Sequence, residues 1–264
     1  MLDWDKQEYL QNVRQRHPLV NCLTNNITVN DVANVILACG ASPVMASDPR
    51  ELEDFIGLAQ AVDLNVGSMA PEMDLSFETA LAVAGRLHKP VVMDPVGAGA
   101  AKYRTGMLLR FLEKYPVAVI RGNASEIRAL AGEAGQTVGV DAAAGDAVTQ
   151  ETLPARTEMA AGLAKKYHTV VAMSGAWDII TDGEKTLVCK RGVPQMSQIT
   201  GTGCMLTGLT AAFVGANPEH ILEATAAATE MMCRGGEIAY QKTQALQAGL
   251  GTMRVQLIDA LSLA

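Results

Sequence analysis

Apolar and polar positions along this chain follow two alternating patterns. Short continuous apolar runs are typical of strands buried on both faces, and longer segments with apolar residues at helical spacing are typical of amphipathic helices. The predicted strands are residues 19–23, 43–46, 62–66, 90–94, 117–121 and 169–174. The predicted helices are residues 3–16, 29–38, 51–59, 74–87, 104–114, 125–131 and 151–167. This alternation predicts an α/β fold in which a central, mostly parallel sheet has helices on both faces.

The last part of the chain departs from that alternation. Residues 179–188 form two alternating runs around Asp182-Gly183, which predicts a hairpin and an antiparallel edge to the sheet. Three further helices are predicted at residues 204–214, 219–240 and 246–262. Residues 132–149 are rich in glycine and alanine, and we expect them to form a surface loop. Because no linker or repeat interrupts the pattern, we expect residues 1–264 to form one domain.

The amino-acid composition limits the classes of binding partner and the cellular compartment that we expect for this protein. The formal net charge of −7 argues against nucleic acid and anionic membranes as partners. No run reaches the roughly 18 apolar residues of a membrane-spanning helix, and the charged N-terminal segment is unlike a signal peptide. The five cysteines are odd in number and lack a zinc-binding spacing, which indicates reduced thiols. We therefore expect a cytoplasmic protein with no nucleic-acid or membrane partner.

The segment Gly201-Thr202-Gly203-Cys204, directly before a long apolar helical run, is the strongest chemical signal in the sequence. Its two glycines allow close approach of the backbone to a ligand, and a helix N-terminus supplies unpaired N–H groups and a positive dipole end. The combination predicts an anion-binding site. If the anion is a phosphoryl group in transfer, Cys204 stands where a base or a positioning group is needed. The segment thus favours group transfer over simple binding.

Charged residues also stand at predicted strand ends, where ligands bind in open α/β sheets. Asp94 ends an apolar strand and can either hold Mg²⁺ or cap a turn, and the sequence favours neither role. Arg121 closes the next strand and can clamp a phosphate. Glu126 can contribute to a metal site, but Asn123-x-x-Glu126 also has the spacing of a capping box, which we favour. The two roles of Glu126 are compatible.

Other polar or flexible side chains near strand ends carry weaker signals. Ser174 suits a phosphate oxygen, although an ordinary strand-end turn is the commoner meaning of Ser-Gly. Asn25 lies in an amide-rich segment and can recognise a polar heteroatom, while Thr28 is interpreted as a helix N-cap. Met45 suits a pocket wall and the core equally well. The four histidines have no ligand spacing, and we interpret them as structural or surface residues.

Taken in order, these segments resemble the hydroxyethylthiazole kinases, enzymes of thiamine salvage with a ribokinase-like fold. The resemblance runs from about residue 18 to the C-terminus and is carried by T-N, G-A-S-P-V-M, N-V-G, D-P-V-G-A-G, R-G-N-A-S-E, S-G and G-T-G-C. It implies transfer of the γ-phosphoryl group of ATP to the primary alcohol of 4-methyl-5-(2-hydroxyethyl)thiazole. It also implies Mg²⁺ and a homotrimer with active sites at its subunit interfaces.

The resemblance also implies a role for each matching residue. The nucleotide-binding positions are Arg121, Asn123 and Ser174, the last a serine where the family often has threonine. The acidic pair near the metal is Asp94 and Glu126. The substrate-binding positions are Asn25, Met45, Gly67 and Gly201, and the catalytic segment is Gly201, Thr202, Gly203 and Cys204. Asn25 and Met45 are expected to face the Gly201–Cys204 loop of a neighbouring subunit.

Cys204 fits the narrower family, because the sugar kinases of this fold have aspartate where hydroxyethylthiazole kinases commonly have cysteine. A helix N-terminus lowers the pKa of a thiol, but a thiolate is disfavoured beside incoming phosphate charge, so we expect a positioning or weak-base role. Three alternatives stay open at this point. They are a kinase for another small alcohol such as a pyrimidine or pyridoxal, a cysteine-nucleophile enzyme that lacks an obvious histidine partner, and a non-catalytic sensor.

Overall fold

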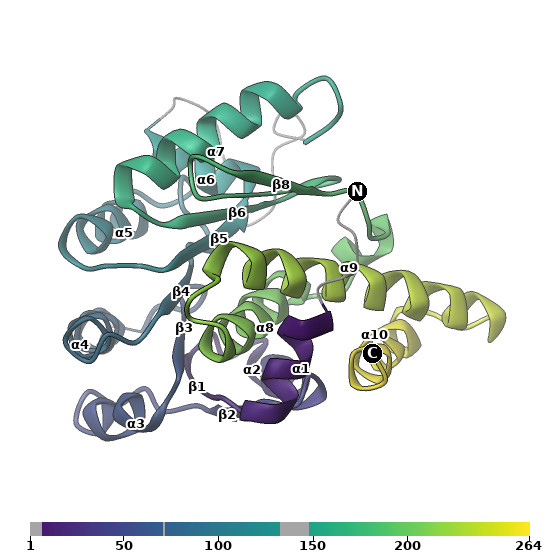
Figure 1. Cartoon of the computed structure of the whole chain (residues 1–264), viewed down its shortest axis with the longest axis horizontal. Coiled ribbons are helices and arrows are strands. Elements are labelled where there is room, and N and C mark those ends of the chain that lie inside the picture. Colours follow the sequence, from purple (N-terminus) through teal and green to yellow (C-terminus); the bar gives the residue numbers. More distant parts are fainter. Residues whose placement is uncertain (1–6, 71, 133–147) are drawn as a thin grey trace.

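One sheet runs through the middle of the molecule, with helices packed on both of its faces (Figure 1). The computed structural model describes residues 7–70, 72–132 and 148–264. Within these residues the sheet has the strand order β2-β1-β3-β4-β5-β6-β7-β8. The strands are β1 (Leu19–Leu23), β2 (Ser42–Val44), β3 (Ala61–Asn65), β4 (Val91–Asp94), β5 (Val119–Asn123), β6 (Val170–Ser174), β7 (Asp178–Thr181) and β8 (Thr186–Cys189). Strands β1 to β6 are parallel and the β7–β8 hairpin is antiparallel, which confirms the predicted fold class and hairpin.

The helices form a layer on each face of the sheet. Helices α3 to α7 cover one face, and α1, α2, α8 and α9 cover the other, with α10 packed against α9 and α2 (Figure 1). Their bounds are α1 (Gln7–Arg16), α2 (Val29–Ala38), α3 (Leu52–Leu58), α4 (Met73–Arg86), α5 (Lys102–Lys114), α6 (Ala124–Ala131), α7 (Leu153–Tyr167), α8 (Thr202–Ala216), α9 (Ile221–Ala245) and α10 (Leu250–Ser262). In the described part of the chain, no helix combines the length and apolarity that a membrane crossing requires.

Successive side chains of a strand point to opposite faces of the sheet. A continuous apolar run therefore places apolar side chains on both faces. Val92 of β4 enters the core shared with α8 and α9, whereas its neighbours Val91 and Met93 enter the core beneath α3 to α7. The continuous apolar runs of the sequence are therefore strands that serve two cores at once.

Helix α8 fixes the position of the predicted anion site. It is buried without interruption from Met205 to Val214, as expected of a helix that lacks a polar face. It packs on β1, β3 and β4 and lies between α2 and α9. Because the strands beneath α8 all end at the same edge of the sheet, its N-terminus is held there by core packing rather than by a flexible loop.

The differences from the predicted elements are confined to their ends and to two connections. Strand β5 continues to Asn123, two residues beyond the predicted end, and a short 3₁₀ helix, η2 (Pro194–Gln198), precedes α8. Most of the predicted loop at residues 132–149, and the start of the first predicted helix, lie outside the described residues. The five cysteines are free thiols, as expected.

The histidines occupy the ends of helices, which confirms their structural interpretation. His17, His88 and His168 each follow a helix with a φ angle between 45° and 53°, the left-handed conformation that terminates a helix. His220 is the N-cap residue that directly precedes α9.

Candidate active site

The candidate site lies where the carboxyl ends of β1, β3, β4, β5 and β6 meet the N-terminus of α8. The parallel register brings Asn65 opposite Asp94, and Asn123 opposite Ser174, so polar residues from separate segments become neighbours. This edge is where ligands bind in open α/β sheets. The fold therefore gathers most of the sequence-predicted residues in one place.

Asp94 is the centre of this group. Its Oδ2 atom accepts hydrogen bonds from Asn65 Nδ2 at 2.9 Å and from Thr207 Oγ1 at 2.7 Å, and lies 3.7 Å from Arg121 Nη1. Its Oδ1 atom is buried and has no hydrogen-bond partner among the described residues. Burial raises the pKa of Asp94, and the Arg121 guanidinium opposes that shift. One oxygen is thus fixed by the protein, and the other has unused capacity to bind a cation.

Arg121 is held between β6 and the start of α8. Its Nη2 atom donates to Ser174 Oγ at 2.8 Å, and only 8% of the residue is exposed. A Cβ atom on Gly203 would lie 2.6 Å from Arg121 Nη1, so the guanidinium rests directly on the backbone of this glycine. The Nε atom has no hydrogen-bond partner in the described part of the chain. Arg121 therefore presents a fixed positive charge, with a donor to spare, beside the helix N-terminus.

Glu126 and Asn123 form the capping box that the sequence favours. Asn123 Oδ1 accepts from the Glu126 amide at 3.0 Å, and Glu126 Oε2 accepts from the Asn123 amide at 2.8 Å. Glu126 Oε1 accepts from the Gly97 amide at 3.0 Å. Burial, followed by the charge of Asp94, raises the pKa of Glu126 to about 7. Both oxygens already have partners, so this residue is less suited than Asp94 to bind a cation directly.

The Gly201–Cys204 turn has the geometry of an anion site. Gly201 adopts a φ of +88°, and a Cβ atom there would collide with Thr28, so only glycine fits without strain. The first helical hydrogen bond of α8 runs from the Met205 amide to the Gly201 carbonyl at 2.8 Å. The amides of Gly203 and Cys204 precede that bond and belong to the unpaired first turn. Thr202 Oγ1 donates to the Met196 carbonyl at 3.1 Å, which ties the turn to η2.

Cys204 lies beside Asn25 of its own chain. Asn25 Nδ2 donates to Cys204 Sγ at 3.2 Å, which corrects the expectation that Asn25 faces this loop across a subunit interface. Burial, followed by the charge of Asp94, raises the pKa of the Cys204 thiol. The expected lowering by the helix N-terminus is therefore outweighed. A protonated thiol with an amide neighbour fits the positioning role and argues against the cysteine-nucleophile alternative.

Asn25 and Gly67 are joined through Asn65. Asn65 Oδ1 accepts from Asn25 Nδ2 at 3.2 Å and from the Gly67 amide at 2.9 Å. Asn25 Oδ1 accepts from the Thr28 amide at 3.1 Å. Thr28 is the N-cap residue of α2, as interpreted from the sequence, but its side chain makes no capping hydrogen bond. Met45 follows β2 and is half-buried against the core on the α8 side of the sheet, outside this hydrogen-bonded group.

Sequence reasoning missed Asn65 and Thr207, which orient Asp94. Asn65 carried a usable signal, because an amide at the end of an apolar strand and before Val-Gly has little reason to be buried in the core. Thr207 carried no signal of a functional role in the sequence, since threonine is common one turn into an apolar helix. Its side chain meets Asp94 only because α8 packs across β4.

A second acid, Asp63, is fully buried on β3 beside Cys22 of β1. Neither of its carboxyl oxygens has a hydrogen-bond partner among the described residues. Burial, followed by the charge of Asp94, raises the pKa of Asp63 well above its ordinary value of 3.8. The folded protein therefore holds this proton more tightly than the unfolded chain, and stability should fall as pH rises from 3.8 towards the folded pKa.

The substitution Asp63→Asn should remove that loss. Within this range we expect the free energy of unfolding of the variant to gain about 1.4 kcal/mol per pH unit relative to the native protein. Urea denaturation of both proteins at a series of pH values above 3.8, the ordinary pKa of Asp63, measures this difference. A difference that stays constant with pH would mean that Asp63 does not hold its proton in the folded state.

Comparisons with known proteins bear on the same chain. The model of the hydroxyethylthiazole kinase family matches residues 10–264. A hydroxyethylthiazole kinase of Clostridium acetobutylicum is 44% identical over 253 residues, which cover 96% of this chain and 92% of that protein. The solved structure of a hydroxyethylthiazole kinase protein from Pyrococcus horikoshii OT3 has a TM-score of 0.85 and 36% identity, with 97% of this chain and 92% of that chain covered.

A more distant structure supports the fold alone. A ribokinase-like superfamily protein of Enterococcus faecalis has a TM-score of 0.64 at 13% identity, and the match covers 97% of this chain and 87% of that chain. The central sheet and its two helical layers are thus those of the ribokinase-like fold.

Proposed function

This chain belongs to the hydroxyethylthiazole kinase family, and from that premise we propose that it transfers the γ-phosphoryl group of ATP to the primary alcohol of 4-methyl-5-(2-hydroxyethyl)thiazole. The product is the thiazole phosphate used in thiamine salvage. One observation carries the proposal: Arg121, Asp94 and the unpaired first turn of α8 converge beside Cys204. Phosphoryl transfer depends mainly on such positioning and on charge stabilisation.

Arg121, Ser174 and the start of α8 bind the phosphate chain in this proposal. The guanidinium neutralises phosphate charge, and the amides of Gly203 and Cys204 donate to the phosphoryl oxygens at the positive end of the helix. Ser174 keeps Arg121 oriented and offers its hydroxyl to the nucleotide. Asn123 ends β5 directly opposite Ser174 of β6. This register supports a role for Asn123 in binding the nucleotide, next to Ser174.

The donor set also fits Mg²⁺, a hard cation that prefers carboxylate oxygens. The free Oδ1 atom of Asp94 is the buried, unpaired acceptor that a cation requires. We assign Glu126 a role through water, because its carboxylate oxygens already accept the Gly97 and Asn123 amides. When bound, Mg²⁺ supplies positive charge against the triphosphate.

The acceptor alcohol binds on the Asn25 side of the site. Asn25 and Gly67, joined through Asn65, provide polar groups for the heteroaromatic ring, and Met45 provides an apolar wall. Gly201 lets the backbone of the turn pack directly against Thr28, which keeps the Gly201–Cys204 segment next to Asn25. Cys204 positions the hydroxyl rather than acting as an effective base, because the raised pKa of the thiol keeps it protonated.

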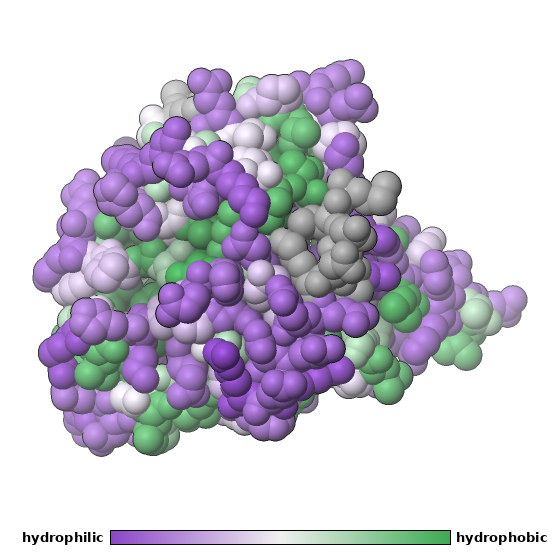
Figure 2. Space-filling view, viewed as in Figure 1, coloured by the Kyte–Doolittle hydropathy of each residue, from purple (hydrophilic) through white to green (hydrophobic). Residues whose placement is uncertain are grey.

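We further propose that the protein works as a cytoplasmic homotrimer. Exposed apolar side chains support this assembly: Ile27, near Asn25 and Thr28, is 78% exposed, and Leu246 of the projecting α9–α10 pair is 62% exposed. Figure 2 shows apolar residues interspersed with hydrophilic ones on the projecting α9–α10 pair. Since the Asn25–Cys204 contact forms within one chain, a neighbouring subunit would cover the site rather than supply Asn25. Sedimentation velocity distinguishes the trimer from the monomer.

The first test is ATP turnover with Mg²⁺, with and without the thiazole alcohol, and with the product identified by mass spectrometry. Formation of a thiazole phosphate that depends on both substrates would support the proposal. Turnover with a pyrimidine alcohol or pyridoxal and none with the thiazole would favour a different alcohol kinase. Tight ligand binding without any ATP turnover would favour a sensor.

Replacing Cys204 separates a positioning role from a catalytic base. A true general base contributes about 10²–10⁴ in rate. We expect Cys204→Ala to lower kcat by only about tenfold and Cys204→Asp to be faster than Cys204→Ala, because an aspartate side chain is deprotonated at neutral pH and can accept the proton, whereas alanine cannot. Steady-state kinetics with both substrates measure this order, with Cys39→Ala, a buried cysteine of another region, as the control. A loss of about 10³ or more in Cys204→Ala would instead make the thiol the base.

A further inference from the structure

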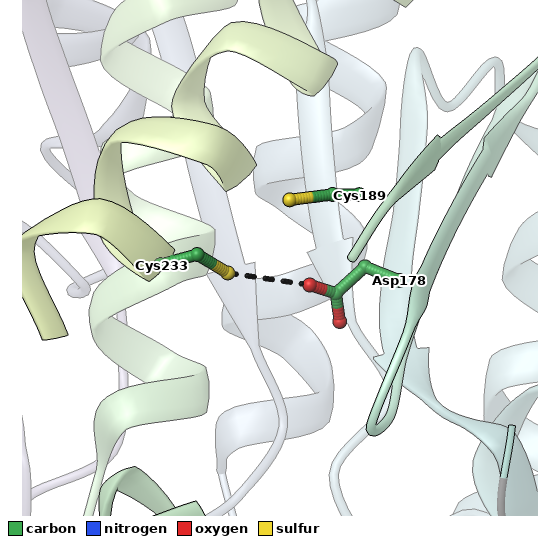
Figure 3. Close-up of side chains that lie close together, drawn as sticks. All are labelled: Asp178, Cys189 and Cys233. Atoms are coloured by element: carbon green, nitrogen blue, oxygen red, sulfur yellow. Dashed lines mark hydrogen bonds between the residues drawn. The ribbon is translucent and has the colours of Figure 1, made fainter. Parts of the chain in front are cut away.

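A second cluster of reactive side chains lies away from the site described above, between the β7–β8 hairpin and α9. Asp178 and Cys189 are directly opposite each other in the antiparallel register, so their side chains are on the same face of the hairpin. Cys233 projects from α9 onto that face, and Cys233 Sγ lies 3.3 Å from Asp178 Oδ2 (Figure 3). One oxygen of Asp178 and the two sulfur atoms all lie within 4.8 Å of one another, and all three residues are buried.

We propose that Asp178, Cys189 and Cys233 form a binding site for a thiophilic divalent cation, with zinc as the natural occupant. Two thiolates and one carboxylate are ligands that zinc accepts, and three protein ligands leave a fourth tetrahedral position for water. From Zn–S distances of about 2.3 Å and Zn–O distances of about 2.0 Å, tetrahedral ligand atoms are roughly 3.5–3.8 Å apart. The observed spacing is within a small side-chain adjustment of that geometry.

Charge and proton balance are consistent with this site. Binding of Zn²⁺ displaces one proton from each thiol to solvent and leaves the zinc–dithiolate–carboxylate unit with a charge of −1. The Arg121 guanidinium, which already lowers the pKa of Asp178 against the effect of burial, offsets part of this charge. Without a cation, the hydrogen bond with Cys189, followed by burial and the charge of Asp178, raises the pKa of the Cys233 thiol.

The surroundings of the cluster favour a structural cation, which holds secondary-structure elements together, over a catalytic one. β8 is the last strand of the sheet in the described part of the chain, so the cluster lies at the sheet's edge. The Gly192 backbone closes the other side, because a Cβ atom there would lie 3.5 Å from Cys233 Sγ. Asp178 Oδ1 accepts from the Gly175 amide at 3.0 Å, one residue beyond Ser174. A bound ion would therefore tie the hairpin and α9 together next to the nucleotide-binding strand β6.

The test is metal binding to the reduced, metal-free full-length protein. Cys204→Ala serves as the background, because it removes the half-buried thiol of the active site from competition. We expect one equivalent of Co²⁺ to give a tetrahedral spectrum with a thiolate-to-cobalt charge-transfer band, and Zn²⁺ to displace it. Zinc-edge X-ray absorption should show two sulfur ligands and lighter atoms in the remaining positions.

Substitutions within the cluster should abolish this signal selectively. In Cys189→Ser and Cys233→Ser we expect zinc affinity to fall by at least about tenfold. The matched control, Cys39→Ser, removes another buried cysteine and should bind zinc as tightly as the background protein. If the serine variants do not fold, the sulfur count in the background protein decides the question by itself. Fewer than two sulfur ligands, no binding at one equivalent, or an equal loss in Cys39→Ser would each overturn the proposal.

Discussion

The substitution Arg121→Ala should lower kcat/KM for ATP by about 10²–10³, which is the usual loss when one preorganised charge-stabilising donor is removed from a transition state. Arg121 has this effect because the structure fixes its guanidinium before ATP arrives. Ser174 accepts from Nη2, Asp94 lies near Nη1, and Gly203 provides a surface for the planar group. A donor that needs no rearrangement stabilises developing charge most strongly, so the loss should fall on kcat as well as on KM. Initial rates of thiazole phosphate formation over a range of ATP concentrations measure both.

Two further variants distinguish this role from a general effect on folding. Arg121→Lys keeps the charge without the two-pronged donor and should retain part of the activity. Gly203→Ala keeps the Arg121 side chain, but the added methyl group would lie 2.6 Å from Nη1 and should displace the guanidinium. We therefore expect this variant also to have a lower kcat/KM for ATP. If Arg121→Ala is folded by circular dichroism and has the kinetics of the native protein, then Arg121 does not bind the phosphates.

The fold was largely predictable because its strands and helices differ in the period of their apolar positions. The predicted boundaries of β1 and α2 agree with the structure residue for residue, and the Asp182-Gly183 turn predicted the antiparallel hairpin. The ends of β5 and α9 were less predictable. Asn123 reads as a cap in the sequence yet also ends the strand, and α9 continues for five residues beyond the predicted end. Tertiary packing settles such ends, and a local pattern does not contain that information.

The candidate site was predictable where a backbone motif marks it and unpredictable where only packing creates it. Gly201–Cys204, Asp94 and Arg121 each stand at a strand or helix end with an evident local reason. Thr207 and Cys233 have no such mark, since each is separated by more than 40 residues along the chain from the side chains it meets. Spacing rules for zinc sites presume ligands in short motifs, which is why the cysteines gave no zinc signal in the sequence.

The substitution Asp94→Asn should cause a loss in kcat of about 10²–10³ and should raise the Mg²⁺ concentration needed for half-maximal rate. Asparagine preserves the shape of the side chain, and its carbonyl oxygen can still accept from Asn65 and Thr207 in place of Oδ2. Its amide nitrogen then occupies the place of Oδ1, the unpaired acceptor, and an amide nitrogen cannot bind a cation. The fold should therefore survive while the cation site is lost. Rates measured across a Mg²⁺ titration at saturating ATP and thiazole alcohol give both quantities.

Two control variants locate the effect at the free oxygen of Asp94. Thr207→Val removes one hydrogen bond to Oδ2 but leaves the carboxylate charge, so it should lower kcat less than Asp94→Asn and leave the Mg²⁺ requirement nearly unchanged. Glu126→Gln keeps one hydrogen-bond acceptor of the capping box. If Glu126 acts only through water, this variant should lose less kcat than Asp94→Asn. A normal Mg²⁺ requirement in Asp94→Asn, together with a raised requirement in Glu126→Gln, would reverse the assignment. Glu126 would then hold the cation, and the buried oxygen of Asp94 would serve the electrostatics of Arg121 instead.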